Sequence, residues 1–251
     1  INPITIDGGP CQSGAGAIEV ELDMELVLSA APHLGSLRVY EAPSNPAGYL
    51  AEWGQIVNDD VPVVSTSWGS CESSSFAQDT STGKALYLQE NTLFTAAAAQ
   101  GQSIFAASGD NGSNDCGNKT PTAPSVDDPA SQPYVTGVGG TSLSINKGSN
   151  AYKTETVWND GPTSAGGGGV SSLWIMPSWQ QGPGVINATY SFGTPCKAAT
   201  GLYCREVPDV SLDADPNTGF VLYCSVTAAG CNSSNPWLEG GGTSAAAPLW
   251  A

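Results

Sequence analysis

Buried strands and helices alternate along the first 140 residues of the chain, and this order restricts the fold more than any other feature of the sequence. Residues 46–58 and 84–100 have the patterns of helices. Strands that alternate with helices pair in parallel through right-handed crossovers, so the sequence predicts an α/β fold with a central, mostly parallel sheet flanked by helices. The predicted strands are short runs rich in Val, Ile and aromatic residues, at Leu37–Ala42, Val61–Ser67, Ser103–Ala107 and Tyr134–Val138.

The second part of the chain has a different character. From about residue 144 onward Gly, Pro, Ser, Trp and Cys dominate, which indicates irregular segments and short hairpins until Ser244 opens a last helix. No repeat and no linker interrupts the 251 residues, and a chain of this length can bury a full core. We therefore expect a single domain over residues 1–251.

The chain is strongly acidic, with seven Lys and Arg against 23 Asp and Glu and a formal net charge of −16. This charge argues against nucleic acids and anionic membranes as partners, and no apolar run is long enough to span a bilayer. It fits a secreted enzyme that works at low pH, and it fits equally a surface charge that only keeps the protein in solution. The start at Ile1, without a signal peptide, indicates a processed piece of a longer precursor.

Seven cysteines are spread along the chain without a Cys-x-x-Cys pair or a Cys/His cluster, so we expect disulfides rather than a zinc site. Disulfides indicate a secreted protein or one in an acidic lumenal compartment. Two pairs are close enough in sequence to close local loops, Cys196 with Cys204 and Cys224 with Cys231, although spacing alone does not fix the connectivity. The odd count leaves one thiol free or paired outside this chain.

The segment from Gly240 to Pro248 is where the chain best exposes a nucleophile, because a run of small residues leads into Thr243, Ser244 and a short helix. Serine needs an adjacent base, which is usually histidine. The single histidine, His33, lies in a turn-like Ala-Pro-His-Leu-Gly context that is unlike the surroundings of a catalytic imidazole. If Ser244 is catalytic, its base is therefore expected to be a carboxylate.

Residues 18–26 hold two candidate carboxylates, and their pattern is ambiguous. Strict alternation of apolar and acidic residues is typical of a strand, whereas Glu, Leu and Met ahead of Pro32 favour a helix that the proline ends. On a helix Glu19 and Asp23 lie about 6 Å apart and can share a proton. On a strand they lie about 13 Å apart and form no pair. An acidic, solvated face is the alternative to a catalytic role.

A third candidate is Asp110, which follows the apolar strand at residues 103–107 in the turn Ser-Gly-Asp-Asn-Gly. The carboxyl ends of the strands in a parallel sheet are the usual place for a site. Asp-Asn-Gly is also strong turn chemistry, so a plain turn aspartate explains the residue equally well.

Together and in this order, these segments resemble the sedolisin family of serine-carboxyl peptidases, of the kumamolisin type, over almost the whole chain. The resemblance implies a subtilisin-like fold in which the Glu/Asp pair is helical. The matching segments are Glu19-Val20-Glu21-Leu22-Asp23-Met24-Glu25, Val63-Val64-Ser65-Thr66-Ser67-Trp68-Gly69, Ala107-Ser108-Gly109-Asp110, Glu155-Thr156-Val157-Trp158-Asn159-Asp160, Gly167-Gly168-Gly169-Val170-Ser171, Val207-Pro208-Asp209-Val210 and Gly241-Gly242-Thr243-Ser244.

The resemblance also implies a role for each candidate residue. Ser244 is the nucleophile, Glu19 is the base, and Asp23 is the partner that raises the proton affinity of Glu19. Asp110 belongs to the oxyanion hole, where it must be protonated, because an ionised carboxylate would repel the negative oxygen of the tetrahedral intermediate. Both requirements are met at acid pH.

Five further residues are implied to flank an extended peptide substrate. They are Ser67, Trp68, Gly69, Gly168 and Gly169. The resemblance places Trp68 near the catalytic carboxylates, and a packed core aromatic is the alternative for this residue.

The sequence also departs from the family pattern. Family catalytic domains have a strand and a helix before the Glu/Asp segment and a calcium site after the serine, and neither is expected here. Any Ca²⁺ ligands would thus lie outside this chain, and no metal ligand is named within it. The missing parts would leave apolar surface uncovered, so the expected partners are peptide substrates and a companion chain or the missing terminal segments. Asp127 and Asp128 resemble a specificity-pocket segment, with a surface loop as the alternative.

The function that these features indicate is a secreted, acid-active serine-carboxyl endopeptidase. The alternatives are a tripeptidyl-peptidase of the same family, a catalytically inactive fragment, and a secreted module that binds peptides or sugars through its seven tryptophans. A histidine-based subtilisin-type protease needs His-Gly-Thr between the acid and the serine, and the sequence contains none.

Overall fold

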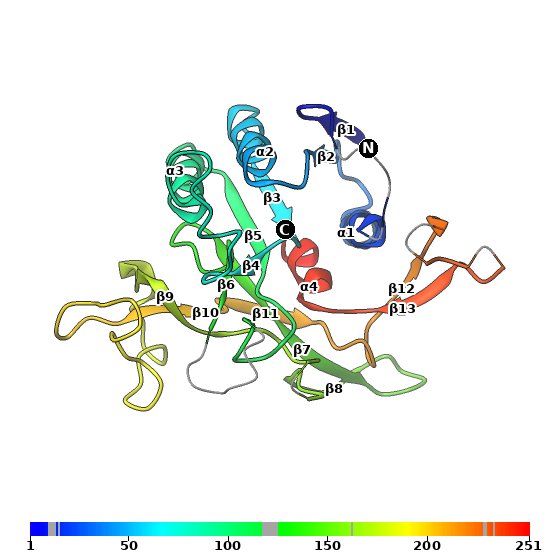
Figure 1. Ribbon diagram of the computed structural model, residues 1–251. Coiled ribbons are helices and arrows are strands. Elements are labelled where there is room, and N and C mark those ends of the chain that lie inside the picture. The colour runs from blue at the N-terminus through cyan, green and yellow to red at the C-terminus, as the bar shows by residue number, and fades with distance from the viewer. Residues whose placement is uncertain (10–13, 15, 117–124, 162, 228–229, 233) are drawn as a thin grey trace.

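A five-stranded sheet forms the centre of the molecule (Figure 1). The computed structural model describes residues 1–9, 14, 16–116, 125–161, 163–227, 230–232 and 234–251. Four strands run parallel in the order β11-β7-β5-β3, and β8 pairs with β7 in the antiparallel sense. The predicted α/β fold with a mostly parallel sheet is thereby confirmed. The strands are β3 (Val63–Thr66), β5 (Ser103–Ala107), β7 (Thr136–Ile145), β8 (Tyr152–Val157) and β11 (Val210–Asp213).

Helices cover both faces of the sheet, and the alternation along β5 shows how. Ile104 and Ala106 pack into one core with residues of α2 (Pro46–Asn58) and α3 (Leu86–Ala99). Phe105, between them, points to the opposite face and packs into the core of α4 (Thr243–Trp250). This alternation is the period of two that a strand imposes on its side chains. None of the described helices is both long and apolar enough to cross a membrane.

The ambiguous acidic segment is a helix, α1, over Ala17–Ala30. Its apolar residues recur at a spacing of four, and Leu22 and Leu26 are buried against Leu222 and Ala245. The same residues would also share one face of a strand, so the spacing does not decide between the two, and the packing of this stripe against Leu222 and Ala245 stabilises the helix. The helical prediction is confirmed, and the strand alternative is excluded.

Shorter strands lie outside the central sheet. The first of them precedes α1 and pairs in parallel with the strand that follows it, which the sequence does not predict. A cavity of about 1080 Å³ lies between this strand pair, α1, α2 and β3. The outlying pairs are β1 (Asn2–Thr5) with β2 (Arg38–Glu41), β4 (Ser70–Cys71) with β6 (Asp127–Asp128), β9 (Gly169–Ile175) with β10 (Cys204–Val207), and β12 (Phe220–Tyr223) with β13 (Trp237–Gly240), and a 3-10 turn spans Ser178–Gln180.

Three disulfides link the described residues. The two local pairs, Cys196–Cys204 and Cys224–Cys231, are confirmed. The third, Cys71–Cys116, closes a separation of 45 residues and is not predicted by the sequence. Cys11 lies outside the described residues.

Thiol titration tests this pairing directly. We expect the denatured, unreduced chain to give at most one thiol, because six of its seven cysteines are in disulfides. The same chain titrated after reduction gives all seven and serves as the reference. Three or more thiols before reduction would contradict the pairing.

Candidate active site

A glycine turn brings Ser244 to its position as the second residue of α4. Gly242, directly before the helix, has φ of +94°, in the left-handed region that favours glycine. A Cβ atom at Gly242 would lie 2.7 Å from Oδ2 of Asp110. Any larger residue would therefore push the serine-bearing turn away from Asp110.

Asp110 lies three residues beyond the end of β5, and Thr243 orients its side chain. The Thr243 backbone N–H donates to Oδ1 of Asp110 over 2.8 Å, and the Thr243 hydroxyl lies 3.0 Å from the same oxygen. Both contacts are made to Oδ1, so Thr243 leaves Oδ2 of Asp110 unengaged. No role for Thr243 follows from the sequence beyond its place in the Gly-Gly-Thr-Ser motif.

Helix α1 supplies two carboxylates to the same place. The Ser67 hydroxyl lies 2.8 Å from Oδ1 of Asp23, to which it donates, and 3.3 Å from the backbone oxygen of Ser244. The Glu19 carboxylate interacts with the Ser244 and Ser67 hydroxyls, and its Oε1 is buried without a hydrogen-bond partner among the described residues. The structure thus brings Glu19 and Asp23 to Ser244 from one helix face.

Burial makes both carboxyls hold protons more tightly. It raises the pKa of Glu19 above the usual 4.5, while the hydrogen bond with Ser244 acts in the opposite direction by favouring the ionised form. Burial also raises the pKa of Asp23 to about 8, against the hydrogen bond from Ser67 and with a smaller addition from the charge of Glu19. At acid pH Asp23 therefore keeps its proton.

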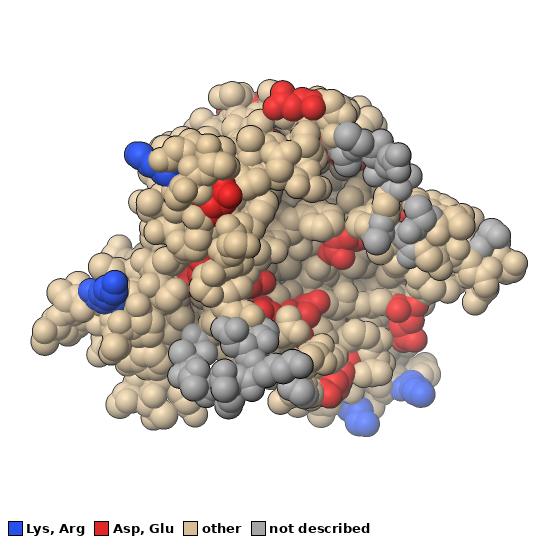
Figure 2. Space-filling model, in the orientation of Figure 1, with Lys and Arg blue, Asp and Glu red and all other residues tan. Residues whose placement is uncertain are grey.

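A cavity of about 330 Å³ opens beside Ser244 and is lined by Asp110, Asp115 and Asp127. Burial raises the pKa of Asp115 to about 6 and that of Asp127 to about 8. Figure 2 shows acidic side chains in the hollow at the middle of this face, whereas Lys and Arg lie at the rim. At acid pH the cavity can therefore present neutral carboxyl groups, which donate hydrogen bonds as well as accept them.

The walls of this cavity are joined by the Cys71–Cys116 disulfide. Cys71 lies opposite Asp127 in the β4–β6 pair and lines the cavity. On the other wall, Asp115 accepts hydrogen bonds from the backbone N–H and the side-chain amide of Asn111, over 3.1 and 2.9 Å, and so fixes the turn after Asp110. Asp115 gives no signal in the sequence that separates it from other turn acids.

Three of the predicted substrate-contacting residues lie at the site. Ser67 and Gly69 line the cavity. Trp68 is 53% exposed, which excludes the alternative of a packed core aromatic. Its ring lies against the start of α1, where a Cβ atom at Gly16 would be 2.8 Å from it.

The other two predicted contacts, Gly168 and Gly169, are not among the residues that line this cavity. Gly168 donates its N–H to the backbone oxygen of Gly112 over 3.3 Å, in the loop that carries Asp110. A Cβ atom at Gly168 would lie 2.8 Å from the backbone oxygen of Val207. Gly168 therefore lets the chain pack closely against β10, and Gly169 is the first residue of β9.

His33 does not take part in this arrangement. It is exposed in the turn that follows α1 and is not among the cavity-lining residues. As His33 is the single histidine of the sequence, the groups that can accept a proton from Ser244 are carboxylates.

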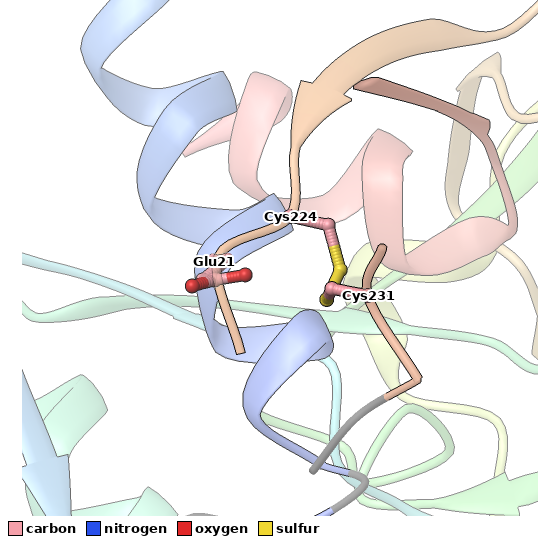
Figure 3. A group of neighbouring side chains, drawn as sticks. All are labelled: Glu21, Cys224 and Cys231. Atoms are coloured by element: carbon pink, nitrogen blue, oxygen red, sulfur yellow. A yellow bond between two sulfur atoms is a disulfide. The ribbon is translucent and has the colours of Figure 1, made fainter. Parts of the chain in front are cut away.

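The described residues contain one cluster with the spacing of a metal site, formed by Glu21, Cys224 and Cys231 (Figure 3). Both sulfur atoms belong to a disulfide, so they offer no thiolate. Calcium needs six to eight oxygen ligands, and this cluster supplies one carboxylate. It does not fit the calcium site that the family resemblance implies, and we assign no metal to it.

The subtilase family matches residues 33–251, which include Ser244 and Asp110. The match spans well over half of the chain, and the protein belongs to this family. Its region begins after Glu19 and Asp23, so the acidic helix lies outside the part that matches the family as a whole.

Within the family the chain is similar to proteins of the serine-carboxyl kind. It is 38% identical to kumamolisin from Bacillus sp. (strain MN-32) over 93% of its own length and 38% of that protein. It is 30% identical to tripeptidyl-peptidase 1 of Canis lupus familiaris, over 94% of its own length and again 38% of the relative. The solved structure of Pseudomonas sedolisin, a serine-carboxyl proteinase complexed with two molecules of pseudo-iodotyrostatin, superimposes with a TM-score of 0.76 at 31% identity.

These similarities confirm the sedolisin- and kumamolisin-like resemblance and the subtilisin-like fold. The superposition covers 100% of this chain and 64% of the sedolisin chain. The chain thus spans less than two fifths of the length of the curated relatives it matches.

Proposed function

We propose that the protein is an acid-active serine-carboxyl endopeptidase that cleaves peptide bonds through an acyl-enzyme on Ser244. The observation that carries the proposal is the meeting at Ser244 of a helical carboxyl pair, Glu19 and Asp23, with Asp110 held by Thr243. Serine-carboxyl relatives of similar sequence support the same chemistry.

The reaction begins with attack of Ser244 Oγ on the carbonyl carbon of the substrate. Glu19 accepts the hydroxyl proton, and Asp23 keeps its own proton. The tetrahedral oxygen is stabilised by the protonated Oδ2 of Asp110. Glu19 then gives its proton to the leaving amine as the peptide bond breaks. In the second half of the reaction water attacks the carbonyl carbon of the acyl-enzyme, Glu19 accepts a proton from the water, and that proton passes to Ser244 Oγ as the ester bond breaks.

The substrates are polypeptides that place one side chain in the cavity lined by Asp115 and Asp127. The site of action is secreted or lumenal, which the three disulfides support because they persist in oxidising compartments. None of the described residues is assigned as a ligand of the Ca²⁺ that the resemblance implies, and no step of the proposed mechanism uses this ion.

The pH profile tests this mechanism. We expect hydrolysis of a denatured protein to be greatest in the acid range and to fade as the pH rises toward 8, because the proposed donor role of Asp110 requires a neutral carboxyl and because Asp23, whose pKa is about 8, begins to lose its proton. A Ser-His pair behaves in the opposite way, since acid protonates the imidazole. The measurement is initial rate from pH 3 to 8, and a maximum near pH 8 would overturn the proposal.

Tripeptidyl-peptidase activity is the second candidate, favoured by the similarity to tripeptidyl-peptidase 1. It differs from endopeptidase activity in its products, since it releases tripeptides from a free amino terminus. Mass spectrometry of the products of one peptide, with its amino terminus free or acetylated, separates the two. An endopeptidase cleaves both forms, and a tripeptidyl-peptidase cleaves the free form.

A further inference from the structure

Helix α1 has a second pair of carboxylates, Glu21 and Glu25, that hydrogen-bond to the edge of β12. The backbone N–H of Tyr223 donates to Oε2 of Glu25 over 3.0 Å. The backbone N–H of Ser225 donates to Oε2 of Glu21 over 3.3 Å, and the Ser225 hydroxyl donates to Oε1 of the same carboxylate. Two glutamates thus accept from three donors at the end of β12 and just after it, about 200 residues further along the chain.

The two N–H donors and the two glutamates that accept from them are spaced by nearly the same distance. Every second N–H of an extended chain points to the same edge, and Tyr223, the last residue of β12, and Ser225 are about 6.6 Å apart if the chain stays extended. Residues four apart on a helix are about 6 Å apart along its axis. The N–H groups that alternate with them face the other way, as Cys224 donates to Pro236 over 2.7 Å. Because the two spacings match, the hydrogen bonds to this edge fix the position of α1 along the helix axis.

The two carboxyl pairs project from opposite faces of α1. Each residue turns the helix by about 100°, so Glu21 lies about 200° from Glu19, and Glu25 lies likewise from Asp23. Between the faces, Leu22 packs into one cluster with Leu222 of the hairpin and Ala245 of α4. The helix is therefore held between the hairpin on one side and the helix that carries Ser244 on the other.

The hairpin end that meets α1 is itself closed by a disulfide. Cys224 lies between the two donors, Tyr223 and Ser225, and is bonded to Cys231. Figure 3 shows Glu21 beside this disulfide. The strand edge is thus tied at the place where α1 is attached.

We propose that Glu21 and Glu25 are positioning residues for catalysis, which fix the rotation and the axial position of α1 so that Glu19 meets Ser244. The inference rests on the proposed function and extends it by two residues that touch neither substrate nor Ser244. A rotation of α1 by 20° would move a carboxylate on its surface by about 2 Å. Misplacement by about 1 Å can cost about 100-fold in rate, so a small loss of register has a large effect on turnover.

The test uses single and double alanine variants at Glu21 and Glu25 in the full-length protein. We expect Glu21→Ala/Glu25→Ala to lower kcat by about tenfold or more with little change in KM, because the substrate cavity is untouched. Glu25→Gln restores kcat relative to Glu25→Ala, since one amide oxygen can accept the Tyr223 N–H. Ser29→Ala is the matched control: it lies one turn beyond Glu25 on the same face of α1, removes a hydrogen bond to Leu26 within the helix and none to the hairpin, and leaves kcat unchanged.

The pH profile gives a readout that loss of stability alone would not move. The hydrogen bond with Ser244 lowers the pKa of Glu19, so loss of that contact shifts the acid limb of kcat to higher pH. Unchanged kcat in a folded double variant, or a fall in kcat that Glu25→Gln does not restore, would overturn the inference. The proposed function fails separately, if the wild-type protein does not cleave or if Ser244→Ala cleaves equally well.

Discussion

Replacing Ser244 with alanine will lower kcat by about 10⁴-fold or more, since the hydroxyl is the group that forms the acyl-enzyme. Glu19→Gln will give a loss of similar size, because an amide cannot accept the proton of Ser244. The measurement is kcat at the acid optimum for each variant.

The double variant Ser244→Ala/Glu19→Gln sharpens this test. Groups that act as a unit are not additive, so the double variant should be no slower than the slower single variant. Glu239→Gln, an exposed carboxylate on β13, serves as the control and should keep the wild-type rate. Full activity of Glu19→Gln, or losses that multiply in the double variant, would show that Glu19 is not the base.

Raising the pH from 4 to 8 will destabilise the folded protein. Glu90 and Asp128 are buried together, with exposed fractions of 0% and 4%. Burial raises the pKa of Glu90 and that of Asp128, the latter to about 6, and burial likewise raises the pKa of Glu52 to about 7. In the unfolded chain such carboxyls ionise near pH 4. Between about pH 4 and 8 the unfolded state therefore releases protons that the folded state retains, and the free energy of unfolding falls as pH rises.

Thermal unfolding at pH 4, 6 and 8 measures this effect. A loss of about 3 kcal/mol corresponds to about 10 °C in a domain of this size, which is the smallest fall in Tm that we expect. Glu90→Gln keeps a neutral side chain at every pH and should flatten the dependence, whereas Glu239→Gln should leave it as in the wild type. A Tm that rises toward pH 8 would contradict the prediction.

The elements that were predictable from the sequence are those whose signal is local. The helix over Pro46–Asn58 and the strand over Ser103–Ala107 end at the predicted residues, because their apolar periods are clear and turns bound them. The local disulfides join cysteines that are eight and seven positions apart in sequence. Cys71–Cys116 could not be predicted, since its partners meet only when β4 and the loop after β5 are brought together.

The acidic helix shows where local signals end. Residues 18–26 fit a strand or a helix, and the choice depends on Leu222 and Ala245, which lie about 200 residues away in sequence. The family resemblance resolved this choice, whereas composition and periodicity did not. The contacts of Glu21 and Glu25 with β12 have no sequence signal at all, because they depend on which strand edge comes to lie beside α1.

The Cys71–Cys116 bond has a mechanical consequence for substrate choice. It joins β4, which pairs with the strand of Asp127, to the loop that carries Asp115. Together with the backbone hydrogen bonds between Ser125 and residues 113–115, it limits how far the cleft next to Ser244 can widen. The width that this bond helps to set limits the size of the side chains that can enter the pocket. Mild reductants that break the Cys71–Cys116 bond should then let the pocket widen and broaden the range of side chains accepted.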